Sequence, residues 1–447
     1  MEKETVPFTL SLMGNRLASR LINSEMVGAA IITAGFAVAS LVAQKPSAQP
    51  PECDANNGGL KLPQGFCALI VADKLGPARH LAVAANGDVH VMVNRDRSGT
   101  PGGIVAFRDT NGDGRADQIE RFATLDGTEI KWRSDYLYLS SDTQVGRIKM
   151  TPGQLVPKGP VEIIATGFEA QRQHETKSFA FDDQGNMYVN VGAPANACQS
   201  PDRQPNVPGQ DPCPLLERHG GIWRFSADKL NQDQMKDGHR FSTGLRNVVG
   251  IAQNPADRQI YVMQHGRDQL DTLWPGNFTA RDNAELPAEE MFRLSDGADF
   301  GWPKCFYNFE LKKKVLMPEY GGDGKMVGHC DTVGQPLVTF TGHLGPNDLM
   351  FYSGAQFPAK YRGGAFIAFH GSWNREPQDG YRVTFVPWKG SAPAGASETF
   401  ADGFAGAQKG PGPSLHRPVG LAQGPDGSLY VSDSKQGTIW RILYRGN

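Results

Sequence analysis

Cationic and amide side chains stand at the starts of several apolar segments in this chain of 447 residues. The positions are Arg79, His174, Arg246 with Asn247, Asn347 and Arg417. An apolar strand does not need such residues at its start, so their recurrence at equivalent places points to chemistry. Guanidinium groups bind carboxylates in a bidentate manner. Three arginines and a histidine brought to one place would therefore favour an anionic ligand that carries several carboxylates.

A repeated unit explains how these residues could come together. A short amphipathic strand that ends in a small-residue turn occurs six times, and the copies begin at Cys67, Glu120, Val161, His239, Pro336 and Glu398. An apolar strand follows each copy, and in several units an Asn-Gly, Gln-Gly or Asp-Gly turn then leads to an aromatic-rich strand. A period of roughly 40 to 50 residues with four strands per unit predicts an all-β, six-bladed β-propeller with loop insertions. The innermost strands of such a fold begin around one mouth of a central channel.

The first 48 residues do not fit this repeat. Lys3, Arg16 and Arg20 precede an uncharged apolar run over residues 26–43, which gives way to a polar, proline-rich segment. This pattern is typical of an export signal. The run is also long enough for a minimal membrane span, so an uncleaved anchor is the alternative. We expect residues 1–48 to be a signal peptide or N-terminal membrane anchor plus a polar linker, and residues 49–447 to form the propeller.

The cysteines agree with export to an oxidising compartment. The six cysteines form three local couples, which are Cys53 with Cys67, Cys198 with Cys213, and Cys305 with Cys330. Neighbour pairing would place disulfides in the loop insertions and a periplasmic or secreted location would follow, with free buried cysteines as the alternative. The formal net charge of −2 gives no electrostatic reason to expect a nucleic-acid partner.

One acidic segment has the spacing of a calcium loop. The sequence DTNGDGRAD places oxygen-bearing side chains at Asp109, Asn111, Asp113 and Asp117. Alternating oxygen ligands with a glycine for the tight bend suit Ca²⁺. The bidentate glutamate and flanking helices of an EF-hand are missing, so a polar hairpin that binds nothing is the alternative. Any calcium here would be structural.

Five motifs occur in the order found in one known family. They are HETKSFAFDDQGNMYVNVG from His174, GLRNVVGIA from Gly244 with QHG from Gln264, FGWP from Phe300, FHGSWNRE from Phe369, and HRPVGLAQGPDGSLYVSD from His416. From about residue 60 onward the chain resembles the pyrroloquinoline quinone (PQQ) dependent sugar dehydrogenases of the soluble glucose dehydrogenase and L-sorbosone dehydrogenase type. The resemblance implies a six-bladed quinoprotein oxidoreductase with PQQ and Ca²⁺ as cofactors.

The resemblance assigns the chemistry to two residues. His174 matches the family's catalytic histidine and would remove the hydroxyl proton of the substrate, since an imidazole titrates near neutral pH. Arg246 would stabilise the negative charge that develops on the quinone oxygen during reduction.

The cofactor contacts are carried over in the same way. Asn247 and Gln264 would hydrogen-bond PQQ, and Arg79 and Arg417 would pair with its carboxylates. The family's calcium ion is held largely by backbone carbonyls directly after the glutamine. Those carbonyls would belong to His265 and Gly266.

Two positions depart from the glucose-type pattern. Ala193 stands where those enzymes carry an aspartate that orients the histidine, so another group or a water must set its tautomer. Ser372 stands near the position of their cofactor-binding lysine. His370 and Arg375 are the candidates for that lysine's role.

The substrate follows only from the branch of the family. The sorbosone-like motif suggests a sugar, a sugar aldehyde or a related polyol, with electrons leaving to a separate cytochrome or membrane quinone. Four aromatic residues could stack on a sugar ring or simply pack: Trp302, Tyr307, Trp373 and Trp388. A calcium-dependent propeller lactonase and a noncatalytic binding propeller are the alternatives. The lactonase would need a metal held by carboxylate and Asn side chains at the channel mouth, and the scaffold would not need a convergent histidine.

Overall fold

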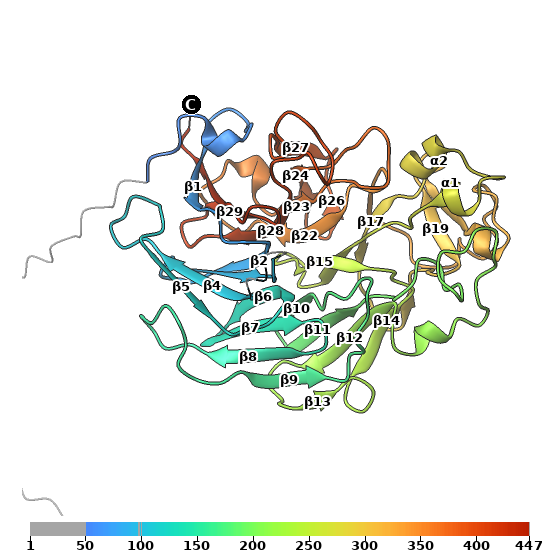
Figure 1. The fold of residues 1–447 in the computed structure, drawn as a ribbon, viewed down its shortest axis with the longest axis horizontal. Coiled ribbons are helices and arrows are strands. Elements are labelled where there is room, and N and C mark those ends of the chain that lie inside the picture. Colours follow the sequence, from blue (N-terminus) through green and yellow to red (C-terminus); the bar gives the residue numbers. More distant parts are fainter. Residues whose placement is uncertain (1–50, 97–98, 100, 447) are drawn as a thin grey trace, which may run out of the picture. The chain divides into compact units, whose positions relative to one another are not determined.

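The computed structural model describes residues 51–96, 99 and 101–446. The predictions for residues 1–48, a signal peptide or membrane anchor with its linker, lie outside these residues. The described chain is almost entirely β-structure, and six four-stranded units form a propeller (Figure 1). The predicted fold class is confirmed. No helix in the described part of the chain is long and apolar enough to cross a membrane.

Each blade is an antiparallel sheet that runs outward from the channel in chain order. Blade 1 contains β2 (Ala78–Val83), β3 (Val89–Val93), β4 (Gly103–Arg108) and β5 (Gln118–Phe122). Blade 2 contains β6 (Gly127–Arg133), β7 (Tyr136–Ser141), β8 (Val145–Lys149) and β9 (Glu162–Thr166). Blade 3 contains β10 (Phe179–Phe181), β11 (Asn186–Val191), β12 (Gly221–Ser226) and β14 (His239–Thr243).

Blades 4 and 5 follow the same order, whereas blade 6 takes its outer strand from the start of the described chain. Blade 4 contains β15 (Val248–Gln253), β16 (Ile260–Gln264), β17 (Glu289–Arg293) and β21 (Val338–Phe340). Blade 5 contains β22 (Pro346–Phe351), β23 (Ala365–Phe369), β24 (Arg382–Val386) and β27 (Glu398–Ala401). Blade 6 contains β28 (Pro418–Gln423), β29 (Leu429–Asp433), β30 (Ile439–Tyr444) and, as its outer strand, β1 (Phe66–Ala72).

The ring closes by pairing the two ends of the described chain. Strand β1 pairs antiparallel with β30, with Phe66 opposite Tyr444, so the blue strand lies beside the red ones in Figure 1. This closure removes an open sheet edge, which would otherwise template aggregation. Apolar side chains from neighbouring blades form a buried cluster at each blade interface of the described ring.

Short elements decorate this ring. Two short strands pair in parallel with the outer strands of blades 2 and 3: β13 (Gln232–Asp233) and β18 (Ala298–Asp299). Two small hairpins are also present: β19 (Cys305–Asn308) with β20 (Lys313–Leu316), and β25 (Trp388–Lys389) with β26 (Ala392–Pro393). The helices are α1 (Leu270–Leu273) and α2 (Ala280–Glu285), with 3₁₀ turns η1 (Asn57–Gly59), η2 (Pro214–Glu217), η3 (Pro318–Tyr320) and η4 (Ala359–Tyr361).

The three predicted disulfides are present between neighbouring cysteines: Cys53–Cys67, Cys198–Cys213 and Cys305–Cys330. The second and third lie in the long insertions after β11 and β18. Those insertions share one apolar cluster with α1 and with the residues on either side of α2, and this cluster includes Ala193 and Trp302. The two disulfide-bearing insertions therefore pack against each other, directly after the strand that ends at Val191. Disulfides are typical of proteins that fold outside the cytosol.

Candidate active site

A cavity of about 210 Å³ lies where the innermost strands of blades 3 to 6 begin. Nine residues singled out from the sequence line it: His174, Arg246, Asn247, His265, Gly266, Asn347, His370, Trp373 and Arg417. The strand starts therefore converge as expected for a propeller. A larger cavity of about 860 Å³ lies beside β1, and none of the predicted site residues lines it.

His174 is held in one tautomer by a main-chain carbonyl. Its Nδ1 lies 2.6 Å from the carbonyl oxygen of Ala193, which can only accept a hydrogen bond. Nδ1 therefore carries the proton and leaves Nε2 as the free acceptor. The departure at Ala193 is thus explained, because its backbone takes over the orienting task of the missing aspartate. Burial lowers the pKa of His174 well below its ordinary value, and the positive charge of Arg246 adds to this effect, so the imidazole is neutral.

The backbone around His174 is tightly constrained. His174 has φ of 54°, in the left-handed region that costs a non-glycine residue energy. The side-chain amide of Gln171 donates to the carbonyls of His174 (2.8 Å) and Gly192 (3.1 Å) and fixes the two segments together. A Cβ atom at Gly192 would lie 2.6 Å from the His174 oxygen, so only glycine fits there. Such strain is tolerated where the surroundings hold a functional side chain.

Arg246 lies on the cavity wall and is paired with a residue that the sequence reasoning missed. Its Nη2 donates to Asp268 at 2.7 Å and its Nη1 donates to the carbonyl of Gly266 at 2.9 Å. Asp268 also binds Arg203 at 3.0 Å. Burial alone would raise the pKa of Asp268, but the charge of Arg246 and the nearby His343 outweigh it and hold this pKa well below its usual range.

Gln264 does not line the cavity, which differs from the predicted contact with the cofactor. Its Oε1 accepts the backbone N–H of Arg246 at 2.8 Å, and its Nε2 donates to Glu290 at 3.0 Å. Glu290 in turn lies 3.3 Å from the buried ammonium of Lys314. The amide is fully used in positioning Arg246, because both of its ends have protein partners.

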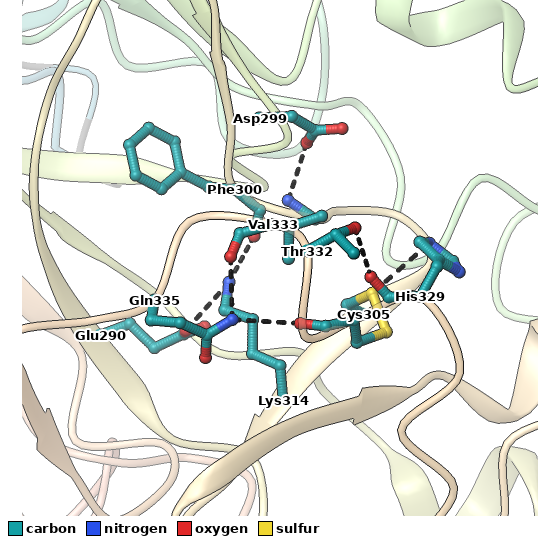
Figure 2. Close-up of a disulfide and its surroundings, with 11 residues drawn as sticks. Glu290, Asp299, Phe300, Cys305, Lys314, His329, Thr332, Val333 and Gln335 are labelled. Carbon is teal, nitrogen blue, oxygen red and sulfur yellow. Dashed lines mark hydrogen bonds and ion pairs between the residues drawn. A yellow bond between two sulfur atoms is a disulfide. The ribbon is translucent and has the colours of Figure 1, made fainter.

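The Cys305–Cys330 insertion anchors this support. Figure 2 shows Lys314 between the main-chain carbonyl of Phe300, to which it donates, and Glu290, close to the disulfide. Burial lowers the pKa of Lys314 and raises that of Glu290, while each charge favours the ionised form of the other. The FGWP motif and the disulfide hairpin thus connect to Arg246 through a chain of buried polar contacts.

The remaining predicted cofactor residues divide into two groups. Arg417 lines the cavity and donates to the carbonyls of His370 (3.1 Å) and Gly371 (2.6 Å). His370 also lines it, and its Nε2 lies 2.6 Å from Ser434 Oγ. Burial lowers the pKa of His370 well below its ordinary value, with Arg417 and Arg79 adding to the shift. Arg79 lies nearby but does not line the cavity.

Arg375 does not line the cavity, and its role in binding the cofactor stays a prediction. Its Nη2 forms a 2.5 Å ion pair with Glu285 of α2, and its Nη1 donates to the carbonyl of Gly342 at 2.9 Å. Of the two candidates for the missing lysine's role, the structure therefore brings only His370 to the cavity. Sequence spacing could not show which of His370 and Arg375 reaches the cavity, because both lie in the same loop.

The predicted calcium-binding backbone is ordered by a second missed residue. Glu289 accepts the N–H of Gly266 at 2.9 Å and that of Gly345 at 3.1 Å. Burial raises the pKa of Glu289 to about 7, and these hydrogen bonds offset part of the effect. His265 Nε2 lies 3.0 Å from the carbonyl of Pro346, and burial lowers its pKa to about 4. Whether the carbonyls of His265 and Gly266 hold calcium stays a prediction.

Charged side chains of the innermost strands of blades 1 and 2 lie next to Asn347 of the cavity lining. His80 Nε2 lies 2.7 Å from the carbonyl of Asn347, and its Nδ1 lies 3.1 Å from Glu129. Lys131 binds the same carboxylate at 2.7 Å. Burial would raise the pKa of Glu129, but Lys131 and His80 lower it to about 2. These contacts connect Asn347, which lines the cavity, to strands β2 and β6.

The predicted calcium loop is the turn between β4 and β5 and lies outside the cavity. Its candidate ligands are Asp109, Asn111, Asp113 and Asp117. Asp109 accepts the N–H groups of Gly112 (2.7 Å) and Gly114 (2.8 Å), and Asp117 accepts that of Thr110 (2.7 Å). These bonds are within the loop itself, and those from Thr110 lower the pKa of Asp117. A calcium ion here stays a prediction.

Fold and site together define a propeller whose innermost strands present an arginine- and histidine-lined cavity. A family model described as TrAA12-like matches residues 60–445, so the chain belongs to this family. A PQQ-dependent pyranose dehydrogenase of Coprinopsis cinerea is 28% identical over 258 residues, which are 49% of this chain and 34% of that protein. An uncharacterised protein of Borreliella burgdorferi is 29% identical over 203 residues, 45% of this chain and 48% of that protein. These matches span a third to a half of the relatives.

Solved structures agree on the fold. The holo form of the pyranose dehydrogenase PQQ domain of Coprinopsis cinerea has a TM-score of 0.68 at 19% identity and covers 89% of this chain and 99% of that one. The calcium structure of a Trichoderma reesei family AA12 enzyme has a TM-score of 0.70 at 16% identity, covering 86% and 97%. The apo form of the soluble aldose sugar dehydrogenase of Escherichia coli has a TM-score of 0.54 at 15% identity, covering 85% and 100%. The family relationship predicted from the motifs is confirmed.

Proposed function

We propose that this protein is a PQQ-dependent dehydrogenase that oxidises a sugar, a sugar aldehyde or a related polyol, with His174 as the base. The observation that carries this proposal is the placement of His174, whose Nδ1 is fixed by the Ala193 carbonyl while its ring lines the cavity beside Arg246. The name of the Coprinopsis relative supports the same chemistry.

The cavity fits an anionic cofactor with several carboxylates. Arg246 and Arg417 supply positive charge, and Arg79 lies close by. Two buried atoms of the lining, Arg246 Nε and Asn247 Oδ1, have no hydrogen-bond partner in the described part of the protein. Buried polar atoms are rarely left unpaired, so such atoms support a bound polar group. Arg246, Asn247, His370 and Arg417 would hold PQQ, and the backbone carbonyls of His265 and Gly266 would hold Ca²⁺ beside it.

Different residues of the chain would have different roles in the oxidation. Bound PQQ supplies an acceptor for the hydride that leaves the alcohol carbon. His174 Nε2 takes the proton of the substrate hydroxyl, and the Ala193 carbonyl stabilises the imidazolium that forms. Arg246 places a positive charge where negative charge grows, while Asp268 and Gln264 fix its position.

The lactonase alternative has less support. It requires carboxylate and amide side chains that are free to bind a metal at the mouth. Asp268 is paired with Arg246 and Arg203, and both oxygens of Glu289 bind backbone N–H groups. Neither carboxylate belongs to a metal-sized group of ligands among the described residues.

The location and the electron acceptor belong to the same proposal. Three disulfides favour export to the periplasm or the medium, with residues 1–48 as a signal peptide or anchor. The electrons would pass to a separate cytochrome or membrane quinone, because the sequence has no motif for covalent haem.

The experiment is a titration of the metal-free protein with PQQ, with and without calcium, followed by dye reduction with aldoses, sorbosone and polyols. We expect activity that requires both additions. His174→Ala should lower kcat by roughly 10²- to 10⁴-fold and leave PQQ binding intact. His239→Ala is the matched control, since His239 is 49% exposed on an outer strand and pairs with Asp296. Absence of PQQ binding, or full activity of His174→Ala, would refute the proposal.

A further inference from the structure

The cavity of about 860 Å³ beside β1 has no role in the proposed oxidation. Most of the residues that line it are apolar, and two of them leave large side chains in water: Ile119 is 49% and Leu415 is 53% exposed. Apolar side chains left exposed around a concave site forgo the free energy of burial, and they are typical of a place where a ligand binds. The packing of the fold therefore does not account for this cavity.

A single histidine, His416, lines this cavity among the described residues. Its Nδ1 lies 2.8 Å from a carboxylate oxygen of the fully buried Asp433, which accepts the proton of Nδ1. Nε2 is then left as the acceptor, and it has no hydrogen-bond partner in the described part of the chain. The imidazole ring packs edge-on against Trp440, with ring centroids 4.9 Å apart. A histidine backed by a carboxylate in this way can take a proton from solvent and pass it to a ligand.

The carboxylate of Asp433 joins this cavity to the active site. The oxygen of Asp433 that does not bind His416 accepts the backbone N–H of Arg417 at 2.7 Å. Arg417 lines the active-site cavity, where it would pair with PQQ. His416 and Arg417 are consecutive residues at the start of β28, so the two cavities lie on either side of one strand start. The path of protein atoms between the cavities is therefore short, and electron transfer requires a short path.

The cavity also lies close in sequence to the predicted N-terminal segment. Its lining begins with Asp54, which is among the first described residues. The apolar run that predicts an export signal or an anchor ends at residue 43. The connection of about ten residues can span at most about 35 Å. An anchor that stays uncleaved would therefore hold this cavity near a membrane surface.

Building on the proposed function, we propose that this cavity binds the headgroup of a quinone, which takes up the electrons of the reduced cofactor. A quinone ring is flat and apolar, and its two oxygens are the only groups that need polar partners. The apolar walls suit the ring, and His416 Nε2 suits one oxygen. A cytochrome would need a broad docking face, whereas the residues here line a concave cavity.

The transfer balances in electrons and protons. Reduction of the quinone to the hydroquinone takes two electrons, which the reduced cofactor loses, and two protons, one on each oxygen. His416 Nε2 takes a proton from solvent and gives it to the oxygen that it contacts, while the Asp433 carboxylate stabilises the imidazolium in between. The second oxygen takes its proton from solvent.

The kinetic test uses the full chain loaded with PQQ and calcium, the aldose that it oxidises fastest, and two electron acceptors. Decylubiquinone has a quinone headgroup and an apolar tail, whereas ferricyanide accepts one electron and no proton. The double variant Ile119→Gln with Leu415→Gln makes the cavity wall polar, so it should raise KM for decylubiquinone about tenfold. KM for ferricyanide should change less than about twofold.

Leu311→Gln with Leu337→Gln is the matched control, since these leucines are 42% and 40% exposed and do not line the cavity. It should leave KM for both acceptors unchanged. An unchanged KM for decylubiquinone in the cavity variant, or an equal loss with both acceptors, would overturn the inference.

His416→Gln tests the proton transfer, because glutamine can form a hydrogen bond but does not take up a proton near neutral pH. The kcat with decylubiquinone should fall at least about tenfold, whereas the kcat with ferricyanide should change less than about twofold. Equal losses with the two acceptors would mean that His416 only supports the fold around Arg417, and would overturn its role with the quinone.

A binding measurement separates this inference from the proposed function. Quinones quench the fluorescence of nearby tryptophan residues, and Trp440 lines the cavity. Decylubiquinone should quench the cofactor-free protein saturably, and the cavity variant should weaken this binding about tenfold. If PQQ does not bind, the proposed function fails, but this titration still decides whether the cavity binds a quinone. If the loaded protein reduces ferricyanide or a cytochrome and decylubiquinone neither quenches nor accepts electrons, only the quinone site fails.

Discussion

The acidic loop over residues 109–117 and the active-site cavity are both rich in polar side chains, but they use these side chains differently. In the loop, Asp109 and Asp117 accept backbone N–H groups of the loop itself, so the turn is locally complete. In the cavity, Arg246 and Asn247 come from one strand start, Arg417 comes from another blade, and buried atoms of Arg246 and Asn247 remain without partners.

This difference allows the two polar clusters to be ranked as candidate ligand sites. Short-range spacing alone produces a turn whose polar groups satisfy one another, and this requires no ligand. The cavity gathers groups that are distant in sequence and leaves some of their hydrogen-bonding capacity unused, although burying such atoms costs free energy. The buried contacts that run from Lys314 through Glu290 and Gln264 hold Arg246 in place despite that cost. The cavity is therefore the better candidate for a ligand site.

The largest expected effect comes from breaking the support behind Arg246. Lys314→Met leaves the buried carboxylate of Glu290 without its charge partner, and losing one member of a buried ion pair costs about 3–5 kcal/mol. Chemical unfolding measures this change in the free energy of unfolding. The double variant Lys314→Met with Glu290→Gln should recover most of the loss, because no buried charge is then unpaired. A single variant as stable as the wild type would contradict the account.

The next effect concerns Arg246 itself. Arg246→Met should lower kcat by roughly 10²- to 10³-fold, the usual result of removing a group that stabilises developing charge. It should also weaken PQQ binding, which an absorbance titration measures separately. Arg240→Met is the control, because Arg240 is exposed and makes its contact with Leu216 outside the cavity. Retention of more than a tenth of the wild-type kcat would show that the cavity charge is not used in catalysis.

The pH dependence of kcat tests the state of His174. The base must be neutral, and burial together with Arg246 lowers its pKa well below 6.5. A lowered pKa moves the acid limb of the profile to lower pH, so kcat should vary less than about threefold between about pH 6.5 and 8. In Arg246→Met the acid limb should move upward, since one positive charge is gone. A midpoint at or above 6.5 in the wild type would contradict the assignment.

The smallest effect is expected at the acidic loop. Because its carboxylates already have partners, calcium must compete with them, and we expect binding no tighter than the 10⁻⁴–10⁻³ M range of extracellular calcium modules. Asp113→Ala should alter neither kcat nor PQQ affinity. Calorimetric titration with calcium, on wild-type protein and on this variant, provides the measurement. Submicromolar affinity lost in Asp113→Ala would show that the loop is a built cation site and would weaken the contrast with the cavity.

Much of the fold was predictable because each blade repeats the same local signals. Turn glycines such as Gly87, Gly185 and Gly427 precede second strands, and the outer strands end in small-residue turns. The convergence of His174 and Arg246 followed from the propeller geometry. Pairing of nearest cysteines was also predictable, because the couples are separated by only 14, 15 and 25 residues in the sequence.

The rest of the site depends on contacts that spacing does not encode. Asp268 lies after β16, and Glu289 begins β17, which is not an innermost strand; their roles arise from what they face in the folded chain. Gln264 and Arg375 have an amide and a guanidinium group that could bind a cofactor, but these groups bind protein partners. The Ala193 carbonyl could not be found from side-chain types, since every residue has one. Only the presence of an acid two residues after Gly266 offered a signal for Asp268.

The most direct test is a crystal structure of the protein soaked with PQQ and calcium. The account predicts PQQ in the 210 Å³ cavity, in contact with Arg246 and Arg417 and with His174 Nε2 facing it. Arg246 Nε and Asn247 Oδ1 should then gain partners. PQQ bound elsewhere, for example in the larger cavity beside β1, with this cavity holding only water, would contradict the account.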